Sequence, residues 1–459
     1  MRSKRWWFVL LTASSLGPGA QALAADPEPT LAPEEKIFGL SMIWQEANYN
    51  FAFFDLSPEL DWDAEYKNAV TRALATETTY EYLREAQRFV ALLGEAHTSL
   101  KLGEIYRSRF GGIPPIELEE IERRAVVINV AESLSAELPL GSEIVSLDGR
   151  ATAEVLKTDV FPFLSASTEQ YLWRRSIRGH RWRAVGLLTG EAGTRVTLTV
   201  ETPGGEVKDV VVERVSPTAE IDWARRPRNE LPLLEFRWLP GDIVYFALNS
   251  FNDPAIVELF EVHLEELSRA RAVILDVRNN GGGNSRNGWN IGRHFSDVPL
   301  AASRWKTRTH LAAYKAWGAR SQDPEKKAHA EMNAWDGPTE LSWIDRPEDG
   351  GIEVPLAILL GPSTYSAAED FLSFMRAVPH GVYVGGRSAG STGQPLNFPI
   401  PGGASVGITS KRDTMADGTE FVGYGVVPDV DVHQTVRSFR EGWDPVMERA
   451  VAVLEERMP

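Results

Sequence analysis

Apolar residues recur every three or four positions in the first part of the chain, which is the spacing of one face of an α-helix. The pattern predicts three helices, over Pro33–Phe54, Asp61–Ala75 and Thr78–Leu93. Thr78 and Glu81 form a capping-box pair at the start of the third helix. Together these segments predict a helical N-terminal domain over residues 33–105.

After residue 108 the helical pattern ends. Short segments follow in which apolar and polar residues alternate or β-branched residues are frequent. They predict strands over Ala125–Val130, Glu143–Leu147, Val196–Glu201 and Val207–Val215. The last two runs flank Thr202–Gly205, whose Pro-Gly-Gly sequence favours a hairpin turn. A compact, mostly β domain is expected over residues 108–218.

Strand and helix patterns alternate from about residue 230. Buried strands are expected at Ile243–Leu248, Ala272–Val277 and Val354–Leu360, and helices at Ala255–Ala270 and Ala367–Ala377. This alternation is typical of an α/β core, here over residues 228–459. The polar stretch 300–350 is expected to form a long surface excursion.

The N-terminus has the pattern of a secretory signal over residues 1–25. Arg2, Lys4 and Arg5 precede a short apolar run, and Ala22-Leu-Ala24 fits the cleavage pattern. The run is too short to span a bilayer. Cleavage near Ala24 predicts an exported chain, periplasmic or secreted, with no integral membrane segment after signal removal.

The amino-acid composition excludes several classes of function for this chain. The 459 residues include no cysteine, which excludes a thiol nucleophile, disulfides and thiolate metal sites. The net charge is −16, so nucleic acid is not an expected partner. The eight histidines show no metal-ligand spacing, and neither a metal nor a cofactor is expected.

The segment Leu359–Phe371 joins an apolar strand to a helix through a tight Gly-Pro turn, with Ser366 at the head of the helix. A hydroxyl in this position suits a nucleophile, because helix N-terminal amides stabilise developing negative charge. On these residues alone, a simple N-cap role for Ser366 or Ser363 is the competing interpretation.

Three glycines, Gly281 to Gly283, directly follow the strand that starts at Ala272. Glycines here let backbone amides approach a ligand, as an oxyanion hole requires. A phosphate-binding loop is rejected, because no Lys-Ser or Lys-Thr pair follows. A plain flexible turn remains the alternative.

Two further segments carry candidate side chains. His97 follows the third helix in Leu-Gly-Glu-Ala-His-Thr, and Glu420 lies in a glycine-rich loop before Pro428-Asp429. A structural histidine and an exposed acidic turn are the respective alternatives.

Taken in order, these segments resemble the C-terminal-processing (tail-specific) peptidase family, which includes the tricorn-core peptidases and the interphotoreceptor retinoid-binding proteins. The matching elements are Gly-x-x-His-Thr (94–98), Gly-Ser-Glu-Ile followed by Asp-Gly, Asp-x-Arg-x-Asn-x-Gly-Gly (276–282), Thr-x-Ser-Ala-x-Glu (364–369) and Gly-Val-x-Pro-Asp (425–429). They extend over nearly the whole mature chain.

The resemblance implies a multidomain α+β fold with an N-terminal helical domain, a PDZ-like β domain and an α/β core of the Clp-protease/crotonase type. It implies a serine peptidase acting on proteins or peptides, with Ser366 as nucleophile. The amides of Gly281 or Gly282, with that of Ala367, would form the oxyanion hole.

The sequence departs from many members of the family at the general base. Ser391 stands where those members have a lysine, so a Ser-Lys dyad is not expected. The tricorn-like branch instead implies His97 as base and Glu420 as the residue that orients it. That branch can carry a serine just before the histidine, where this chain has Ala96. Ser391 and Arg387 are candidate cleft residues.

Two other functions remain open from the sequence. One is a different acyl-type chemistry that uses the same oxyanion hole. The other is a catalytically inactive protein that binds a peptide or an apolar ligand on the same scaffold.

Overall fold

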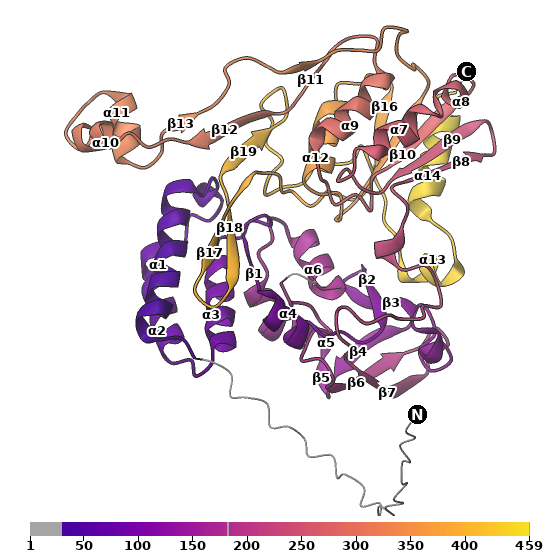
Figure 1. Ribbon diagram of the computed structural model, residues 1–459. Coiled ribbons are helices and arrows are strands. Elements are labelled where there is room, and N and C mark those ends of the chain that lie inside the picture. The colour runs from indigo at the N-terminus through magenta and orange to yellow at the C-terminus, as the bar shows by residue number, and fades with distance from the viewer. Residues whose placement is uncertain (1–29, 181–182, 459) are drawn as a thin grey trace, which may run out of the picture.

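The computed structural model describes residues 30–180 and 183–458. The predicted signal segment and its cleavage site lie outside these residues. The described chain forms one mixed α and β structure with two main sheets, shown in Figure 1. None of the described helices has the length and apolar character needed to cross a membrane.

Three helices open the structure, as the apolar spacing predicts. They are α1 (Pro33–Asn50), α2 (Trp62–Leu74) and α3 (Thr79–Ala91). The capping box of Thr78 and Glu81 is confirmed. The expected first helix is too long at its C-terminal end, because α1 stops at Asn50 and Phe51 packs edge-on against Phe54 beyond it.

A six-stranded, antiparallel sheet follows, with strand order β2-β3-β4-β6-β7 and the short β5 (Arg150–Ala151) paired with β4. Its strands are β2 (Ile116–Ile121), β3 (Arg124–Val130), β4 (Glu143–Leu147), β6 (Arg195–Glu201) and β7 (Val207–Glu213). Helix α6 (Glu169–Arg178) packs on β2. This unit has its own buried cluster, separate from the rest of the core. The predicted strand and hairpin pattern of this region is therefore confirmed.

The second six-stranded sheet has the order β20-β16-β15-β10-β9-β8 and is parallel except for the pairing of β8 with β9. Its strands are β8 (Leu234–Leu239), β9 (Ile243–Leu248), β10 (Ala272–Asp276), β15 (Leu356–Leu360), β16 (Gly381–Gly385) and β20 (Val430–Asp431). Both faces of the sheet are covered, as a parallel sheet requires.

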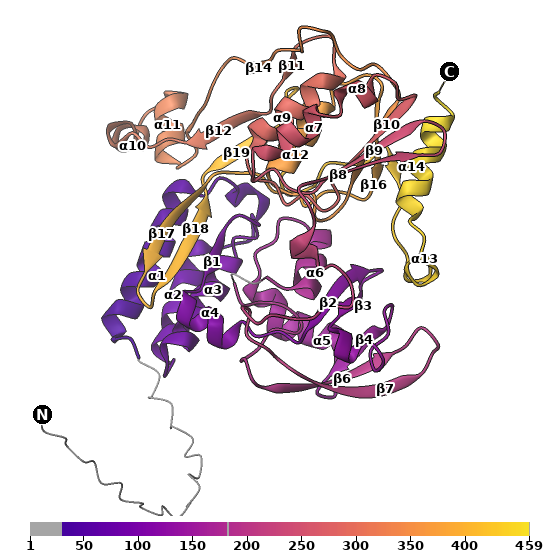
Figure 2. The same ribbon diagram turned by 45° about the vertical axis from the view of Figure 1, so that its right-hand side comes forward.

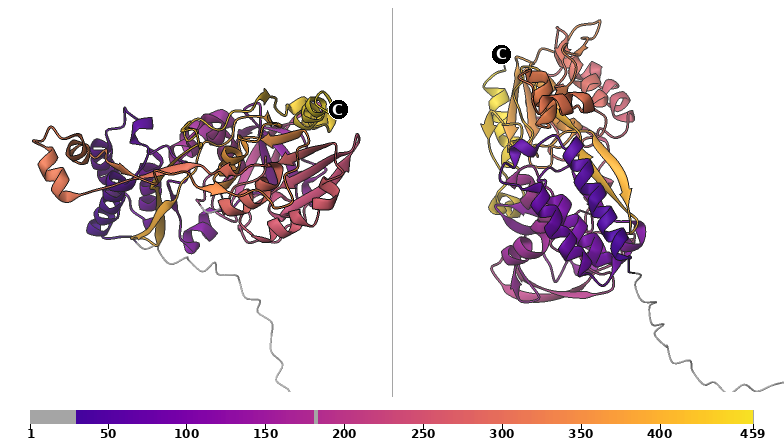
Figure 3. Two further views of the ribbon diagram at one scale, coloured as in Figure 1. Left: turned by 90° about the horizontal axis from the view of Figure 1, so that it is seen from above. Right: turned by 90° about the vertical axis from the view of Figure 1, so that its left-hand side faces the viewer.

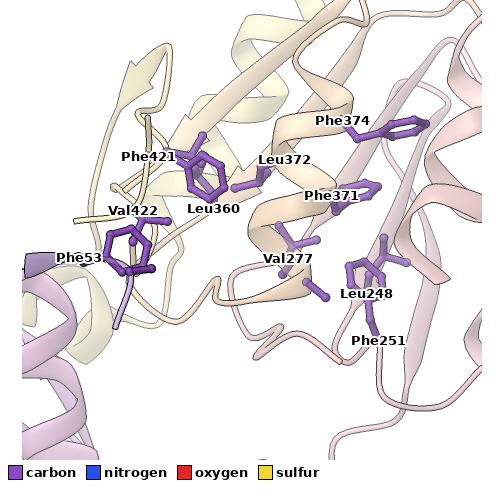
Figure 4. Close-up of a cluster of buried hydrophobic side chains, with 14 of the residues drawn as sticks. Phe53, Leu248, Phe251, Val277, Leu360, Phe371, Leu372, Phe374, Phe421 and Val422 are labelled. Atoms are coloured by element: carbon purple, nitrogen blue, oxygen red, sulfur yellow. The ribbon is translucent and has the colours of Figure 1, made fainter. Parts of the chain in front are cut away.

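Alternate residues of β15 enter two different hydrophobic clusters. Ile358 and Leu360 face α12 (Ala367–Met375), whereas Leu359 faces α14 (Pro445–Glu455). Figure 4 shows Phe371 and Phe374 of α12 among the apolar side chains of the first cluster. This packing fixes the turn between β15 and α12, where Ser366 lies.

The helix expected over Ala255–Ala270 is interrupted. It forms α7 (Ala255–Glu261) and α8 (Leu264–Leu267), with His263 between them. The His263 ring stacks on Phe236 of β8 at a centroid distance of 3.9 Å. The helical spacing did not reveal this break, because it depends on a contact with a distant strand.

A β-hairpin from the C-terminal part of the sequence lies among the N-terminal helices. It consists of β17 (Pro395–Ile400) and β18 (Ala404–Thr409), and β18 pairs with β1 (Ser99–Lys101). In Figures 1 and 2 this hairpin runs beside α1 and α3, far from its neighbours in sequence. The pairing anchors the segment directly after His97 to the second half of the chain.

Residues 300–350 form the expected excursion, and Figure 3 shows it reaching over the N-terminal helices. It contains β11 (Leu300–Ala301), β12 (Arg304–Arg308), α10 (Ala312–Gly318), α11 (Pro324–Ala330), β13 (Trp335–Asp336) and β14 (Trp343–Ile344). Arg308 donates to the carbonyl oxygen of Phe51, which holds the excursion against the end of α1.

Candidate active site

Ser366 stands on the sharp turn from β15 into α12. Its φ of 59° lies in the left-handed region, which a serine adopts at a cost in free energy. Its side chain makes no capping hydrogen bond to α12, so the N-cap interpretation of its hydroxyl does not hold. Its amide donates to the carbonyl oxygen of Ser391 at 3.0 Å, which ties the turn to the 388–391 loop.

His97 lies against this hydroxyl although it is 269 positions away in sequence. Its Nε2 atom is 2.9 Å from Ser366 Oγ, and its Nδ1 atom is 2.7 Å from Ser391 Oγ. The ring of Tyr365 stacks on the imidazole at a centroid distance of 4.4 Å and an angle of 13°. Both ring nitrogens are thus engaged, and the ring plane is held by an aromatic neighbour.

The direction of these hydrogen bonds follows from the hydroxyl of Ser391. This hydroxyl donates to Oε1 of Glu95, and a hydroxyl has only one proton to give. It must therefore accept from His97, so the proton of the neutral imidazole is on Nδ1. Nε2 is left as an acceptor that faces Ser366 Oγ. This is the tautomer that a general base for a serine needs.

Glu95 is a buried carboxylate with several donors around it. It accepts from the hydroxyls of Ser391 and Thr409 and from the amides of His97 and Thr98, the last two at 2.9 and 3.1 Å. Burial alone would raise the pKa of Glu95, but the neighbouring imidazole of His97 and the hydroxyls of Ser391 and Thr409 hold it below its usual value. The carboxylate is therefore ionised beside His97.

The structure does not bring Glu420 to this group. Its carboxylate is bound by Arg412, with Nη2 to Oε2 at 2.6 Å, and Arg412 also binds Asp55. The position expected for Glu420 is occupied by Glu95, two residues before the histidine. The signal was present in Gly-Glu-Ala-His, but sequence spacing could not show that the side chain of Glu95 turns back towards Ser391.

Three predicted oxyanion residues meet at the same turn. A Cβ atom built on Gly282 would lie 2.6 Å from Ser366 Cβ, so the two backbones are in direct contact. The Gly282 amide already donates to Asn280 Oδ1 at 2.9 Å. Within residues 30–180 and 183–458, the amides of Gly281 and Ala367 donate no hydrogen bond. These two amides are the available donors.

Glu369 holds the loop that carries Ser391. It is fully buried and accepts from Ser388 Oγ at 2.5 Å, from the Gly390 amide at 2.7 Å and from the Ser391 amide at 2.8 Å. Burial raises the pKa of Glu369 to about 8. The sequence pattern contained this residue in its Ser-Ala-x-Glu element, but without a structural role.

Ser391, predicted only as a cleft residue, is thus part of the hydrogen-bonded chain. Arg387, the other predicted cleft residue, is exposed on the loop after β16 and makes no hydrogen bond or ion pair with another described residue. Nearby, Lys411 pairs with the buried Asp413 at 2.9 Å. No group of three or more potential metal-ligating side chains occurs in the described parts of the chain.

Three features of this site are those of a serine hydrolase. A strained serine stands at a strand–helix turn, a histidine contacts its hydroxyl, and unpaired backbone amides lie beside it. Residues 242–432 match the model of peptidase family S41. The matched region is that of a C-terminal-processing peptidase, and the chain is a serine peptidase acting on peptides or proteins. The matched region includes Ser366 and Ser391 but not His97.

Solved structures give the same fold. Mature CPAF is 17% identical, with a TM-score of 0.68 over 92% of this chain and 96% of that chain. A peptidase structure from Parabacteroides merdae is also 17% identical, with a TM-score of 0.52 over 93% and 97%. None of the curated proteins compared with the sequence matches it.

Proposed function

We propose that the chain is an endopeptidase in which Ser366 is the nucleophile, His97 the general base and Glu95 the acid that orients His97 through Ser391. The observation that carries this proposal is the unbroken series of hydrogen bonds from Ser366 Oγ through His97 and Ser391 to Glu95. Glu95 takes the role that the resemblance assigns to Glu420.

In the first step, Ser366 Oγ attacks the carbonyl carbon of the scissile peptide bond while its proton passes to Nε2 of His97. The resulting imidazolium donates through Nδ1 to Ser391, whose hydroxyl donates to the ionised Glu95. The carboxylate charge thus stabilises the imidazolium through one intervening hydroxyl. The amides of Gly281 and Ala367 donate to the tetrahedral oxyanion.

In the second half, the C–N bond breaks and the proton on Nε2 passes to the leaving amine. This leaves an acyl ester on Ser366. A water molecule then gives its proton to His97 and attacks the ester carbon, and the same oxyanion donors serve again. Cleavage of this ester restores the Ser366 hydroxyl and releases the second product as a carboxylic acid.

The substrates we propose are exported proteins or peptides. The predicted signal segment supports export to the periplasm or the exterior. We further propose that the unit built on β2 to β7 is the PDZ-like domain that the resemblance implies, between the helical N-terminal domain and the peptidase core. An inactive binding protein would leave the strain at Ser366 and its contact with His97 without a purpose.

The test is labelling of the purified protein by a fluorophosphonate, with the modified residue mapped by mass spectrometry. Labelling of Ser366 that is lost in His97→Ala is the expected result. Labelling should also become slow in Glu95→Gln but stay at the wild-type rate in Glu420→Gln. A folded protein that is not labelled, or labelling that survives His97→Ala, would overturn the proposed site.

A further inference from the structure

The backbone just before His97 is held by side chains from the unit built on β2 to β7, residues 116–213, here called the β2–β7 unit. The Ala96 amide donates to Ser167 Oγ at 3.0 Å, and the Ala96 carbonyl oxygen accepts from Nη2 of Arg183 at 2.7 Å. Ser167 precedes α6 and Arg183 follows it, and Figure 2 shows α6 where this unit meets the rest of the molecule. Ala96 is fully buried, so water does not compete for either group. The two contacts fix the peptide from which His97 extends.

Arg183 is a buried cation that makes no ion pair with a carboxylate of residues 30–180 and 183–458. It is 5% exposed, and its Nε and Nη1 atoms lack hydrogen-bond partners. Burial lowers the pKa of Arg183, and the nearby charges of Glu95 and Arg175 act on it in opposite directions. A buried guanidinium with so few partners costs free energy of folding. Such costs are typical of functional sites, and the bond to Ala96 is what connects this side chain to one.

Ser167 also contacts the proposed acid. Its hydroxyl accepts from the Ala96 amide and donates to Oε1 of Glu95 at 3.4 Å, which uses its single proton. The Glu95 carboxylate in turn accepts from the amide of His97. The turn of residues 95–97 is therefore held from outside by the β2–β7 unit and from inside by its own carboxylate.

The same unit supports the imidazole ring and the loop after β16. Tyr171 of α6 stacks on Tyr365 at a centroid distance of 5.3 Å and an angle of 12°, and Tyr365 stacks on His97. Thr168 Oγ1 donates to the carbonyl oxygen of Ala389 at 2.8 Å, in the loop that carries the relay hydroxyl. The β2–β7 unit thus touches the acid, the segment of the base and the loop between them.

We propose that Ser167 and Arg183 are positioning residues for the catalytic histidine. They hold the Ala96 peptide so that Nε2 of His97 faces Ser366 Oγ, and neither touches the reacting atoms. This inference rests on the proposed function, because it concerns the base assigned there. A displacement of the base by about 1 Å breaks its contact with the nucleophile and costs about 10²-fold in rate. The reaction at Ser366 therefore depends on side chains that the α/β core does not supply.

The experiment measures both the rate and the end point of Ser366 labelling by a fluorophosphonate in the full chain. A misplaced base slows the labelling but leaves every Ser366 reactive in the end, whereas partial unfolding lowers the labelled fraction. Arg183→Met should slow labelling by about 10²-fold. Ser167→Ala should slow it by about tenfold, because the contact of Arg183 with Ala96 stays in place. Both variants should reach complete labelling.

Conservative variants and matched controls come from the same unit. Ser167→Thr keeps the hydroxyl and Arg183→Lys keeps a charged donor, so each should be labelled much faster than Ser167→Ala or Arg183→Met. Ser146→Ala removes a hydroxyl that donates to a side chain of β6, and Arg214→Met removes an arginine that donates to a carbonyl oxygen of its own unit. Both controls should be labelled at the wild-type rate.

The inference is overturned if folded Ser167→Ala and Arg183→Met proteins are labelled at the wild-type rate, whether or not labelling is complete. If Arg183→Met does not fold, as judged by its thermal unfolding, Ser167→Ala and Ser167→Thr decide the question. In these cases, wild-type labelling that is lost in His97→Ala leaves the proposed function standing. A folded wild-type protein that is not labelled overturns the proposed function and this inference with it.

Discussion

His97 Nδ1 lies 2.7 Å from Ser391 Oγ but 3.7 Å from the nearer carboxylate oxygen of Glu95. The carboxylate therefore acts on the imidazole mainly through the hydroxyl between them. By the resemblance to the family, Ser391 stands where many members have a lysine base. In the site proposed above, Ser391 links His97 to Glu95, so this site does not need the lysine.

The first prediction distinguishes the role of Glu95 in catalysis from that of Glu420. Glu95→Gln should lower kcat/KM by about 10²- to 10⁴-fold, because an amide in place of the acid no longer stabilises the imidazolium or fixes the tautomer. Glu420→Gln should change kcat/KM by about twofold or less, since its carboxylate is bound to Arg412. Steady-state cleavage of a peptide substrate measures both. A large loss in Glu420→Gln with little effect in Glu95→Gln would contradict the assignment.

The second prediction concerns the relay hydroxyl. Ser391→Ala removes the acceptor for the Nδ1 proton of His97 and should lower kcat by about 10²-fold or more, with a smaller change in KM. Because Ser391 and Glu95 act in one chain, Ser391→Ala combined with Glu95→Gln should be little worse than the more damaging single variant. Additive losses in this double-mutant cycle would show that the two residues act separately.

Much of the fold follows from local patterns. The strands β4 and β9 have the predicted bounds, because short apolar runs between turn residues leave few alternatives. The capping box of α3 could also be predicted, because it depends only on Thr78 and Glu81. The break between α7 and α8 was not, since His263 packs on a strand that is distant in sequence.

The candidate site, too, could be predicted only in part from local sequence patterns. Ser366 and the glycines at 281–283 lie at strand ends, where the sequence pattern alone indicates an exposed turn. His97 reaches them only because β1 pairs with β18, and no local pattern predicts that pairing. The choice between Glu95 and Glu420 depends on side-chain direction after Gly94, whose φ of 63° turns the chain.

The third prediction uses neighbouring glycines as test and control. Gly282 has a φ of 92°, and an added Cβ would lie 2.6 Å from Ser366 Cβ and 2.7 Å from the carbonyl oxygen of Tyr365. Gly282→Ala should therefore displace the nucleophile turn and lower kcat/KM by about 10²-fold or more. Gly281→Ala meets nothing within 4 Å and should keep most of the activity.

Peptide cleavage and fluorophosphonate labelling rates measure this difference, and thermal unfolding shows whether each variant is folded. Equal losses in folded Gly281→Ala and Gly282→Ala proteins would contradict the expectation. A fully active Gly282→Ala protein would show that the turn moves without cost, and that its contact with Ser366 does not set the geometry of the nucleophile.

The fourth prediction is a pH dependence of stability that comes from Glu369. Its folded-state pKa of about 8 lies above the usual 4.5, so the folded protein holds this proton more tightly than the unfolded chain does. The stabilisation from this proton is complete below about pH 4.5 and is lost as the pH rises to about 8. The loss amounts to as much as about 5 kcal/mol.

Glu369→Gln removes this titration, because the amide stays neutral. The difference in the free energy of unfolding between variant and wild type should therefore change steadily between pH 5 and 8, in favour of the variant at the higher pH. Urea unfolding at several pH values measures it, with the exposed Glu348→Gln as control. Parallel curves for Glu369→Gln and wild type over this range would show that Glu369 is already ionised, and that the three hydrogen bonds it accepts outweigh its burial.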